Sequence, residues 1–272
     1  MTDILYSNNE ANALTHSEMS EDWRKSSEIL KAKLILDNIE NNNDLVDIGC
    51  GWGSTLLQLK GKIEKLVGID ESSHRAQNLI NNHKEIDFFE AHSSNLPLKN
   101  SSYSNILMSH IFHEISQFSK DEHQSIKEVK RVLKKNGHLI IIDHSQPLNG
   151  YSQVVFKIKK IEILNEYISK FKGDNLNFKI EDTTVSSDVW SVHEFVTKIW
   201  SLSTEAENLE MNETHLSLNL SELENYISQF GFEKKISCFF NPISKLMKYY
   251  GIELLSNNDW GRQLFLIMKK KN

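Results

Sequence analysis

Val46-Asp47-Ile48-Gly49-Cys50-Gly51-Trp52-Gly53 joins an apolar run to three glycines at alternate positions. This pattern predicts a buried parallel strand that ends in a tight turn and feeds a helix. Glycine reaches backbone conformations that are closed to other residues, and it lets the main chain lie directly against a ligand. We therefore interpret the turn as a cofactor loop.

A second apolar strand, Leu66 to Ile69, ends in Asp70, seventeen residues after Gly53. In doubly wound sheets an acid at the tip of the second strand accepts hydrogen bonds from the hydroxyls of a nucleoside ribose. The loop does not match the dinucleotide fingerprint G-x-G-x-x-G, because Ser54 stands where the third glycine belongs. The glycines and the acid together indicate a nucleoside cofactor without naming it.

The motif Asp47–Gly53 resembles that of the class I S-adenosylmethionine-dependent methyltransferases, particularly the type 11 small-molecule group. The first motif of that family is an acid, an apolar residue and G-x-G-x-G. The resemblance continues through Asp70, Asn95–Leu98 and Arg131–Asp143, so it covers roughly residues 25–145. It implies a doubly wound, Rossmann-like α/β fold with a seven-stranded, mostly parallel sheet. It also implies S-adenosylmethionine as cofactor and S-adenosylhomocysteine as product.

The same resemblance implies a set of cofactor-binding residues along the ends of the strands. One position departs from the family, because His92 stands where an acid usually accepts from the adenine amino group. A neutral imidazole nitrogen can accept one hydrogen bond, and the alternative is that backbone groups alone recognise the base. The expected cofactor residues are Arg24, Asp47, Gly49, Cys50, Gly51, Asp70, Glu71, His92, Ser93 and Ser109.

Histidines follow the fourth and fifth expected strands, 103–108 and 139–142. Ligands of open α/β sheets lie beyond the carboxyl ends of the strands. A methyl acceptor needs a base only if it must lose a proton, and imidazole titrates close to neutral pH. We therefore expect His113 and His144 as catalytic residues. No metal is expected, since no clear third ligand accompanies His110 and His113.

Composition limits the function classes. A formal charge of -6 argues against a general nucleic-acid-binding surface. Only two cysteines occur, one of them Cys50 in the loop, so a disulfide framework is not expected. No early segment has the pattern of a signal peptide, and no apolar run is long enough for a membrane helix. We expect a cytoplasmic protein with no nucleic-acid or membrane partner.

The expected organisation is a single methyltransferase domain over residues 1–272. Residues 1–24 form an N-terminal lid segment, with Tyr6, Trp23 and Arg24 as candidates for closing over the cofactor. A helical insertion over residues 146–218 lies between the fifth strand and the last core helix, Ser221 to Gly231. The sixth and seventh strands are expected at 232–240 and 263–269.

The insertion has apolar residues at helical spacing from Tyr151 to Phe171 and from Asp188 to Leu202. Trp190, Phe195 and Trp200 either line a substrate pocket or form an ordinary core. The insertion is accordingly interpreted as a cap that chooses the acceptor, and the alternative is the interface of a homodimer.

These observations favour methyl transfer from S-adenosylmethionine to a small-molecule acceptor by in-line displacement. Two alternatives stay open: a nicotinamide-dependent oxidoreductase, and a non-catalytic S-adenosylmethionine-binding protein. The Asn/Asp-Pro-Pro-aromatic signature of enzymes that methylate nucleic-acid amino groups is absent, because Ser109-His110-Ile111-Phe112 stands after the fourth strand.

Overall fold

The computed structural model describes residues 16–116, 121–147, 150–173, 176–215, 219–240, 244–255 and 263–271. The chain divides into two compact units. The core unit consists of residues 28–146, 216–240 and 263–272, and the insertion unit consists of residues 1–27, 147–215 and 241–262. Among the described residues, no helix has both the length and the apolar composition that crossing a bilayer requires.

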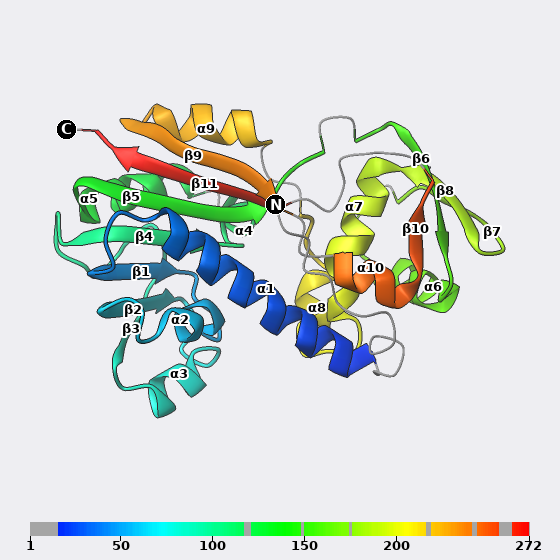
Figure 1. Ribbon diagram of the computed structural model, residues 1–272, viewed down its shortest axis with the longest axis horizontal. Helices are drawn as coiled ribbons and strands as arrows, with labels where there is room; N and C mark the ends of the chain where they lie inside the picture. Colours follow the sequence, from blue (N-terminus) through cyan, green and yellow to red (C-terminus); the bar gives the residue numbers. More distant parts are fainter. Residues whose placement is uncertain are drawn as a thin grey trace. The chain divides into compact units, whose positions relative to one another are not determined.

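The core unit is built on a seven-stranded sheet with the order β3-β2-β1-β4-β5-β11-β9 (Figure 1). The first five of these strands pair in parallel, and β11 runs antiparallel between β5 and β9. The predicted seven-stranded, mostly parallel sheet is therefore confirmed. The strands are β1 (Asp44–Ile48), β2 (Lys65–Asp70), β3 (Ile86–Glu90), β4 (Tyr103–Ser109), β5 (Leu133–His144), β9 (Phe232–Phe240) and β11 (Gln263–Lys270).

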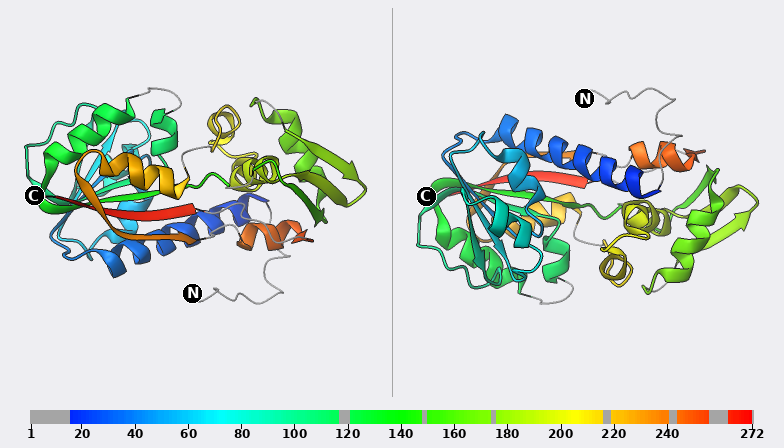
Figure 2. Two further views of the ribbon diagram at one scale, coloured as in Figure 1. Left: turned by 90° about the horizontal axis from the view of Figure 1, so that it is seen from above. Right: turned by 90° about the horizontal axis from the view of Figure 1, so that it is seen from below.

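Side chains alternate between two apolar layers, one on each face of this sheet. In β11, Leu264 and Leu266 pack with Leu223 of α9, whereas Phe265 packs with Ile35 of α1 on the other face. Figure 2 shows α1 and α9 on opposite sides of the strands. This two-sided burial is what a doubly wound fold requires. The helices are α1 (His16–Asn38), α2 (Ser54–Leu59), α3 (Gln77–Asn82), α4 (Phe112–Glu114), α5 (Glu122–Val132) and α9 (Leu220–Ser228).

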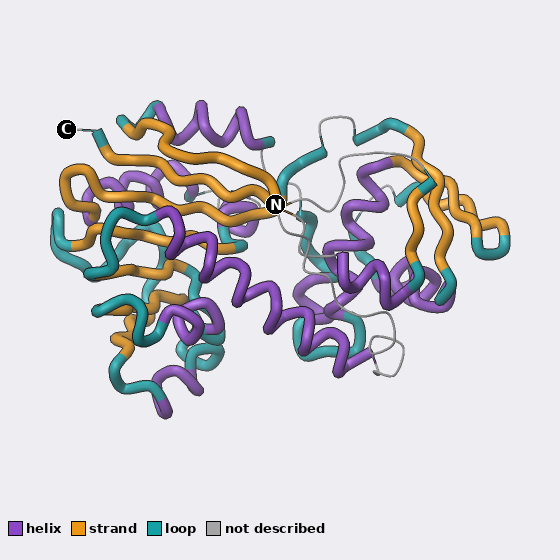
Figure 3. Tube along the Cα trace, in the orientation of Figure 1, coloured by secondary structure: helices purple, strands orange, loops and turns teal. Residues whose placement is uncertain are grey.

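The insertion unit contains strands as well as helices (Figure 3). Its sheet has four antiparallel strands in the order β10-β6-β8-β7. The strands are β6 (Gln153–Ile158), β7 (Phe178–Glu181), β8 (Thr184–Asp188) and β10 (Ile252–Leu254). The helices are α6 (Ile161–Lys170), α7 (Val189–Lys198), the 3-10 helix η2 (Ile199–Ser201), α8 (Glu207–Glu210) and α10 (Ser244–Tyr250).

The insertion contains helices, as the sequence predicts, but it also contains strands that the sequence analysis did not expect. The segment Tyr151 to Phe171 begins as β6 and becomes helical only from Ile161. In β6, Val154 and Phe156 are buried while Lys157 is exposed, so the apolar residues follow the two-residue period of a strand. The predicted helix from Asp188 to Leu202 is found as α7 and η2.

Two ends of core helices also differ from the sequence-based expectation. The last core helix begins at Leu220, one residue before the expected start, and its capping box joins Asn219 and Glu222. Asn219 Oδ1 accepts from the backbone N–H of Glu222 at 3.1 Å, and the Glu222 carboxylate accepts from that of Asn219 at 3.1 Å. The sequence also predicts a helix from Glu122 to Lys134 that Gly137 ends, but α5 ends at Val132 and Gly137 lies within β5.

Candidate functional site

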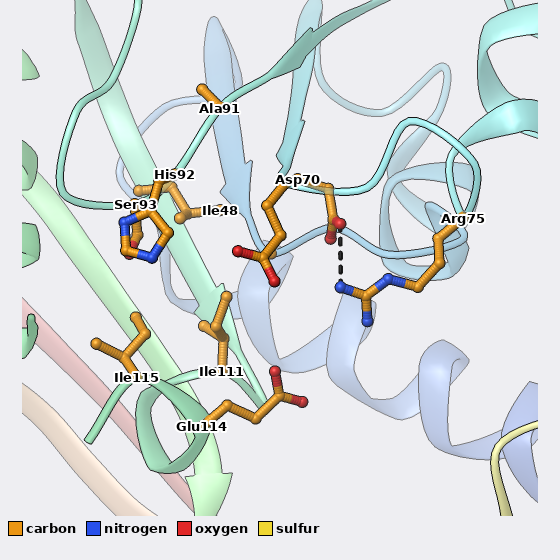
Figure 4. Close-up of a pocket in the computed structure, with 11 residues that line it drawn as sticks. Ile48, Asp70, Arg75, Ala91, His92, Ser93, Ile111, Glu114 and Ile115 are labelled. Atoms are coloured by element: carbon orange, nitrogen blue, oxygen red, sulfur yellow. Dashed lines mark hydrogen bonds and ion pairs between the residues drawn. The ribbon is translucent and has the colours of Figure 1, made fainter. Parts of the chain in front are cut away.

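A cavity of about 270 Å³ opens in the core unit where β1, β2 and β3 end and where the chain leaves β4 (Figure 4). Ligands of open parallel sheets bind at this edge. Five of the ten predicted cofactor residues line it: Gly49, Asp70, Glu71, His92 and Ser93. The other lining residues are Ile48, Arg75, Ala91, Ile111, Glu114 and Ile115.

The glycine loop is held to the second strand by its own backbone. The N–H groups of Gly49 and Cys50 donate to the carbonyl oxygen of Ile69 at 2.7 and 3.0 Å. Gly51 has a φ of 51°, and no heavy atom of a described residue lies within 4 Å of the position a Cβ would take. At Gly49, by contrast, a Cβ would meet Ile111 Cδ1 at 2.0 Å. The loop therefore keeps an open side at Gly51, and this fits a cofactor that lies against the main chain.

Asp70 ends β2 with its carboxylate at the cavity and its side chain 2% exposed. Oδ2 accepts from the backbone N–H of Gly51 at 2.8 Å, and Oδ1 accepts from that of Ser72 at 2.9 Å. Arg75 Nη2 donates to Oδ1 at 3.1 Å. A carboxylate has about four lone-pair positions, so these three bonds leave room for one ribose hydroxyl while Arg75 stays in place.

His92 and Ser93 form the wall of the cavity that follows β3. The backbone N–H of Ser94 donates to His92 Nδ1 at 3.3 Å, and Ser94 Oγ lies 2.8 Å from the same nitrogen. In a neutral ring, an Nδ1 that accepts leaves the proton on Nε2. The Nε2–H group of His92 is then a hydrogen-bond donor for a ligand, whereas the sequence suggested that His92 accepts. Ser93 Oγ is engaged with Ser125 Oγ at 2.8 Å.

Two predicted loop residues are buried beside the cavity. Burial raises the pKa of Asp47 well above its usual value, and the Glu28 carboxylate raises it further. Burial also raises the pKa of the Cys50 thiol, with the Asp47 and Asp70 carboxylates acting in the same direction. Cys50 therefore stays protonated and is not a nucleophile. Ser109, also predicted as a cofactor residue, is the last residue of β4.

The predicted lid residues that the structure describes belong to the insertion unit. Trp23 packs against Trp200 with 5.6 Å between the ring centroids. The Arg24 guanidinium carbon lies 5.7 Å from the centroid of Trp200. Both contacts are made within that unit, and Tyr6 lies outside the described residues.

The two predicted catalytic histidines come together in the core unit, with 5.5 Å between the ring centroids of His113 and His144. The ring of His110 is 4.7 Å from that of His144. His113 Nδ1 lies 2.6 Å from Asp143 Oδ1, and both side chains are buried. Three further residues of the site were not predicted from the sequence: Asp143, Arg75 and Glu114. Of these three, only Asp143 could have been found from the sequence, because it lies at the tip of the fifth expected strand.

Residues 46–141 match the type 11 family model, whose description is "Methyltransferase domain". Over this segment the chain is similar to the class I S-adenosylmethionine-dependent methyltransferases. The matched segment runs from β1 into β5 and carries the glycine loop, Asp70, His92 and His113.

Curated relatives are also similar to only part of the chain. The uncharacterized methyltransferase YcgJ of Bacillus subtilis is 26% identical over 108 residues, which are 38% of this chain and 41% of that protein. The demethylmenaquinone methyltransferase of Thermotoga maritima is 29% identical over 131 residues, 47% of this chain and 53% of that protein. The chain thus spans about half the length of the curated relatives it matches.

A solved structure extends the likeness of fold over nearly the whole chain. The putative methyltransferase of Haloferax volcanii, solved in complex with the Trm112 methyltransferase activator, has a TM-score of 0.55 and 14% identity. The similarity covers 94% of this chain and 93% of that one. At this identity the comparison establishes the fold alone.

Proposed function

We propose that the protein transfers the methyl group of S-adenosylmethionine to a small-molecule acceptor. The observation that carries this proposal is the core-unit cavity, where the glycine loop, Asp70 and His92 meet at the ligand edge of the sheet. When bound there, S-adenosylmethionine supplies a methyl group that its sulfonium already activates. The protein's own task is then to hold the acceptor near attack distance, and such positioning can contribute about 7–11 kcal/mol.

Each lining residue has a role that follows from its chemistry. Asp70 accepts from the ribose hydroxyls, and the main chain at Gly49 and Gly51 lies against the cofactor. Glu71, His92 and Ser93 form the part of the wall nearest the adenine. Asp47, Cys50 and Ser109 shape the loop and the strand end behind this wall. We assign Arg24 no cofactor contact, because its guanidinium is engaged with Trp200.

For the acceptor, we propose a quinone in its reduced, dihydroxylated aromatic form, because the Thermotoga maritima relative is named for demethylmenaquinone. His113 and His144 are the candidate bases. The insertion unit is proposed to choose the acceptor, since it enters the chain directly after β5, whose end belongs to the ligand edge of the sheet. A homodimer interface is the alternative role for that unit.

A transfer assay tests the proposed function. The full-length protein is incubated with methyl-labelled S-adenosylmethionine and a deproteinised extract of small metabolites from its source cells. We expect label in a small-molecule product and formation of S-adenosylhomocysteine. Binding of the cofactor without any transfer would favour the non-catalytic alternative. Oxidation of a metabolite with NAD, and no transfer from S-adenosylmethionine, would favour the oxidoreductase.

A further inference from the structure

A buried histidine–carboxylate pair lies where α4 meets the end of β5. Asp143 Oδ1 is 2.6 Å from His113 Nδ1, and Oδ2 accepts from the backbone N–H of His113 at 3.1 Å. Oδ1 also accepts from the backbone N–H of His144 at 2.7 Å. The side chains of His113 and Asp143 are 2% and 1% exposed. The carboxylate therefore fixes both the ring and the backbone of His113.

These contacts set the protonation of the pair. Burial alone would raise the pKa of Asp143, but the His113 imidazole beside it and its hydrogen bonds hold that pKa below the usual value. The backbone N–H groups that donate to Asp143 also stabilise its ionised form by hydrogen bonding. An ionised carboxylate only accepts, so the proton between the two side chains belongs to Nδ1. Nε2 of the neutral ring is then the nitrogen that takes up a proton.

The environment of the neighbouring His110 disfavours it as the base and leaves proton uptake to His113. Burial lowers the pKa of His110 well below the usual value, and Lys31 lowers it further, so His110 stays neutral. The titratable groups that face His113 within the core unit include Asp143, His110 and His144. The segment that carries His113 also borders the cofactor cavity, because Ile111, Glu114 and Ile115 line it.

We infer that Asp143 is a positioning residue that makes His113 the general base, and that the acceptor is a nucleophile that must lose a proton. The inference rests on the proposed methyl transfer. The acceptor O–H bond breaks and its proton goes to His113 Nε2. The oxygen, or a ring carbon conjugated to it, bonds to the methyl carbon, and the sulfur keeps the electron pair of the broken S–CH₃ bond. His113 then returns its proton to water.

The first test needs no acceptor. The protein is labelled with ¹⁵N-histidine and saturated with S-adenosylhomocysteine, and long-range ¹H–¹⁵N spectra report which ring nitrogen carries the proton. We expect a protonated Nδ1 and an unprotonated Nε2 for His113 at neutral pH, with a change in that pattern in Asp143→Asn. A proton on Nε2 in the parent protein would overturn the inference.

The second test measures label transfer to the extract at saturating S-adenosylmethionine. Asp143→Asn should lower the maximal rate about a hundredfold at pH 6.5, as expected for loss of an oriented base. The rate loss of Asp143→Asn should shrink to below about tenfold at pH 9.5, because the acceptor then ionises without a base from the protein. Cofactor affinity should change less than about threefold. A deficit that is equal at both pH values would assign Asp143 a structural role only.

His113→Gln and the double variant complete the design. Residues that act as one unit have non-additive effects, so the double variant should be about as slow as His113→Gln alone. If the rate loss of the double variant equals the product of the two single losses, His113 and Asp143 do not act as a pair. His138→Gln, which replaces another buried histidine of β5, is the control for stability and should transfer label at the parent rate. If the parent transfers label and Asp143→Asn transfers it equally fast, the inference fails while the proposed function stands.

Discussion

The Arg75 guanidinium lies 3.1 Å from Oδ1 of Asp70, the acid at the tip of β2 that the sequence predicts for a ribose. Arg75 comes from the turns that precede α3, five residues after the acid, and 30% of its side chain is exposed, whereas Asp70 is nearly covered. The dashed line in Figure 4 marks this ion pair at the cavity. A cofactor that uses both ribose hydroxyls must therefore share Oδ1 with Arg75 or displace it.

Arg75→Ala should tighten the binding of S-adenosylhomocysteine by a few fold. The loss of Arg75 frees an acceptor position on Asp70 Oδ1 for the second hydroxyl. Titration calorimetry measures the dissociation constant, and Lys62→Ala, an exposed cation of the same unit, is the control. Weaker binding in Arg75→Ala would show that Arg75 supports the ligand.

Asp70→Ala should weaken the binding of S-adenosylhomocysteine about ten- to a hundredfold, or roughly 1.5–3 kcal/mol, because charge-assisted hydrogen bonds to the ribose are lost. The melting temperature should fall as well, because the backbone N–H groups of Gly51 and Ser72 lose the carboxylate that accepts from them. Asp87→Ala on β3 is the matched control, because its carboxylate pairs at the surface with Lys65 at 3.8 Å. An unchanged dissociation constant in Asp70→Ala would place the ribose elsewhere.

The strands of the core unit were predictable because each carries its own signal. Val46 and Ile48 belong to one apolar layer and Leu45 to the other, and such two-sided burial produces the continuous apolar runs that mark parallel strands. In β6 a two-residue period was also present in the sequence. The helical spacing of the residues that follow masked it, since short apolar runs are ambiguous between helix and strand.

The partners of site residues were harder to predict. His113 and Asp143 are thirty residues apart, and the parallel pairing of β4 with β5 brings the ends of these strands together. Their residue types gave candidates, but the sequence did not give the 2.6 Å contact. Arg75 follows Asp70 in a polar turn, and no periodic pattern there distinguishes a side chain that turns back to the acid from one in solvent.

His193 of α7 should make the insertion unit sensitive to acid. Burial lowers its pKa to about 3, and Lys198 contributes in the same direction. The folded-state pKa lies below the unfolded value of about 6.5, so the unfolded chain takes up a proton first. Stability is therefore lost as the pH falls from about 6.5 toward 3. Lowering the pH from 7 to 5 should therefore reduce the free energy of unfolding by about 2 kcal/mol through His193.

Urea unfolding of the parent protein and of His193→Gln at these two pH values measures the effect. The difference between pH 7 and pH 5 should be about 2 kcal/mol smaller in the variant, whatever its absolute stability. An identical pH dependence in the two proteins would mean that His193 is protonated as readily when folded as when unfolded.

Phe195 and Trp190 should respond differently to truncation. Phe195 is fully buried in the core of the insertion unit, with its ring 5.3 Å from that of Tyr167. Phe195→Ala should cost about 3–5 kcal/mol of unfolding free energy, through lost burial and the cavity left behind. Trp190 is only half-buried, so Trp190→Ala should cost less and is the residue to examine for slower acceptor turnover. Equal destabilisation by both substitutions would contradict this division.

The proposed function requires that the cavity of the core unit binds S-adenosylmethionine, and titration calorimetry measures this binding. The full-length protein is titrated separately with S-adenosylmethionine, S-adenosylhomocysteine and NAD. We predict saturable one-to-one binding of both sulfur ligands, reduced at least tenfold by Asp70→Ala, and no comparable binding of NAD. Binding of NAD more tightly than of either sulfur ligand would contradict the claim.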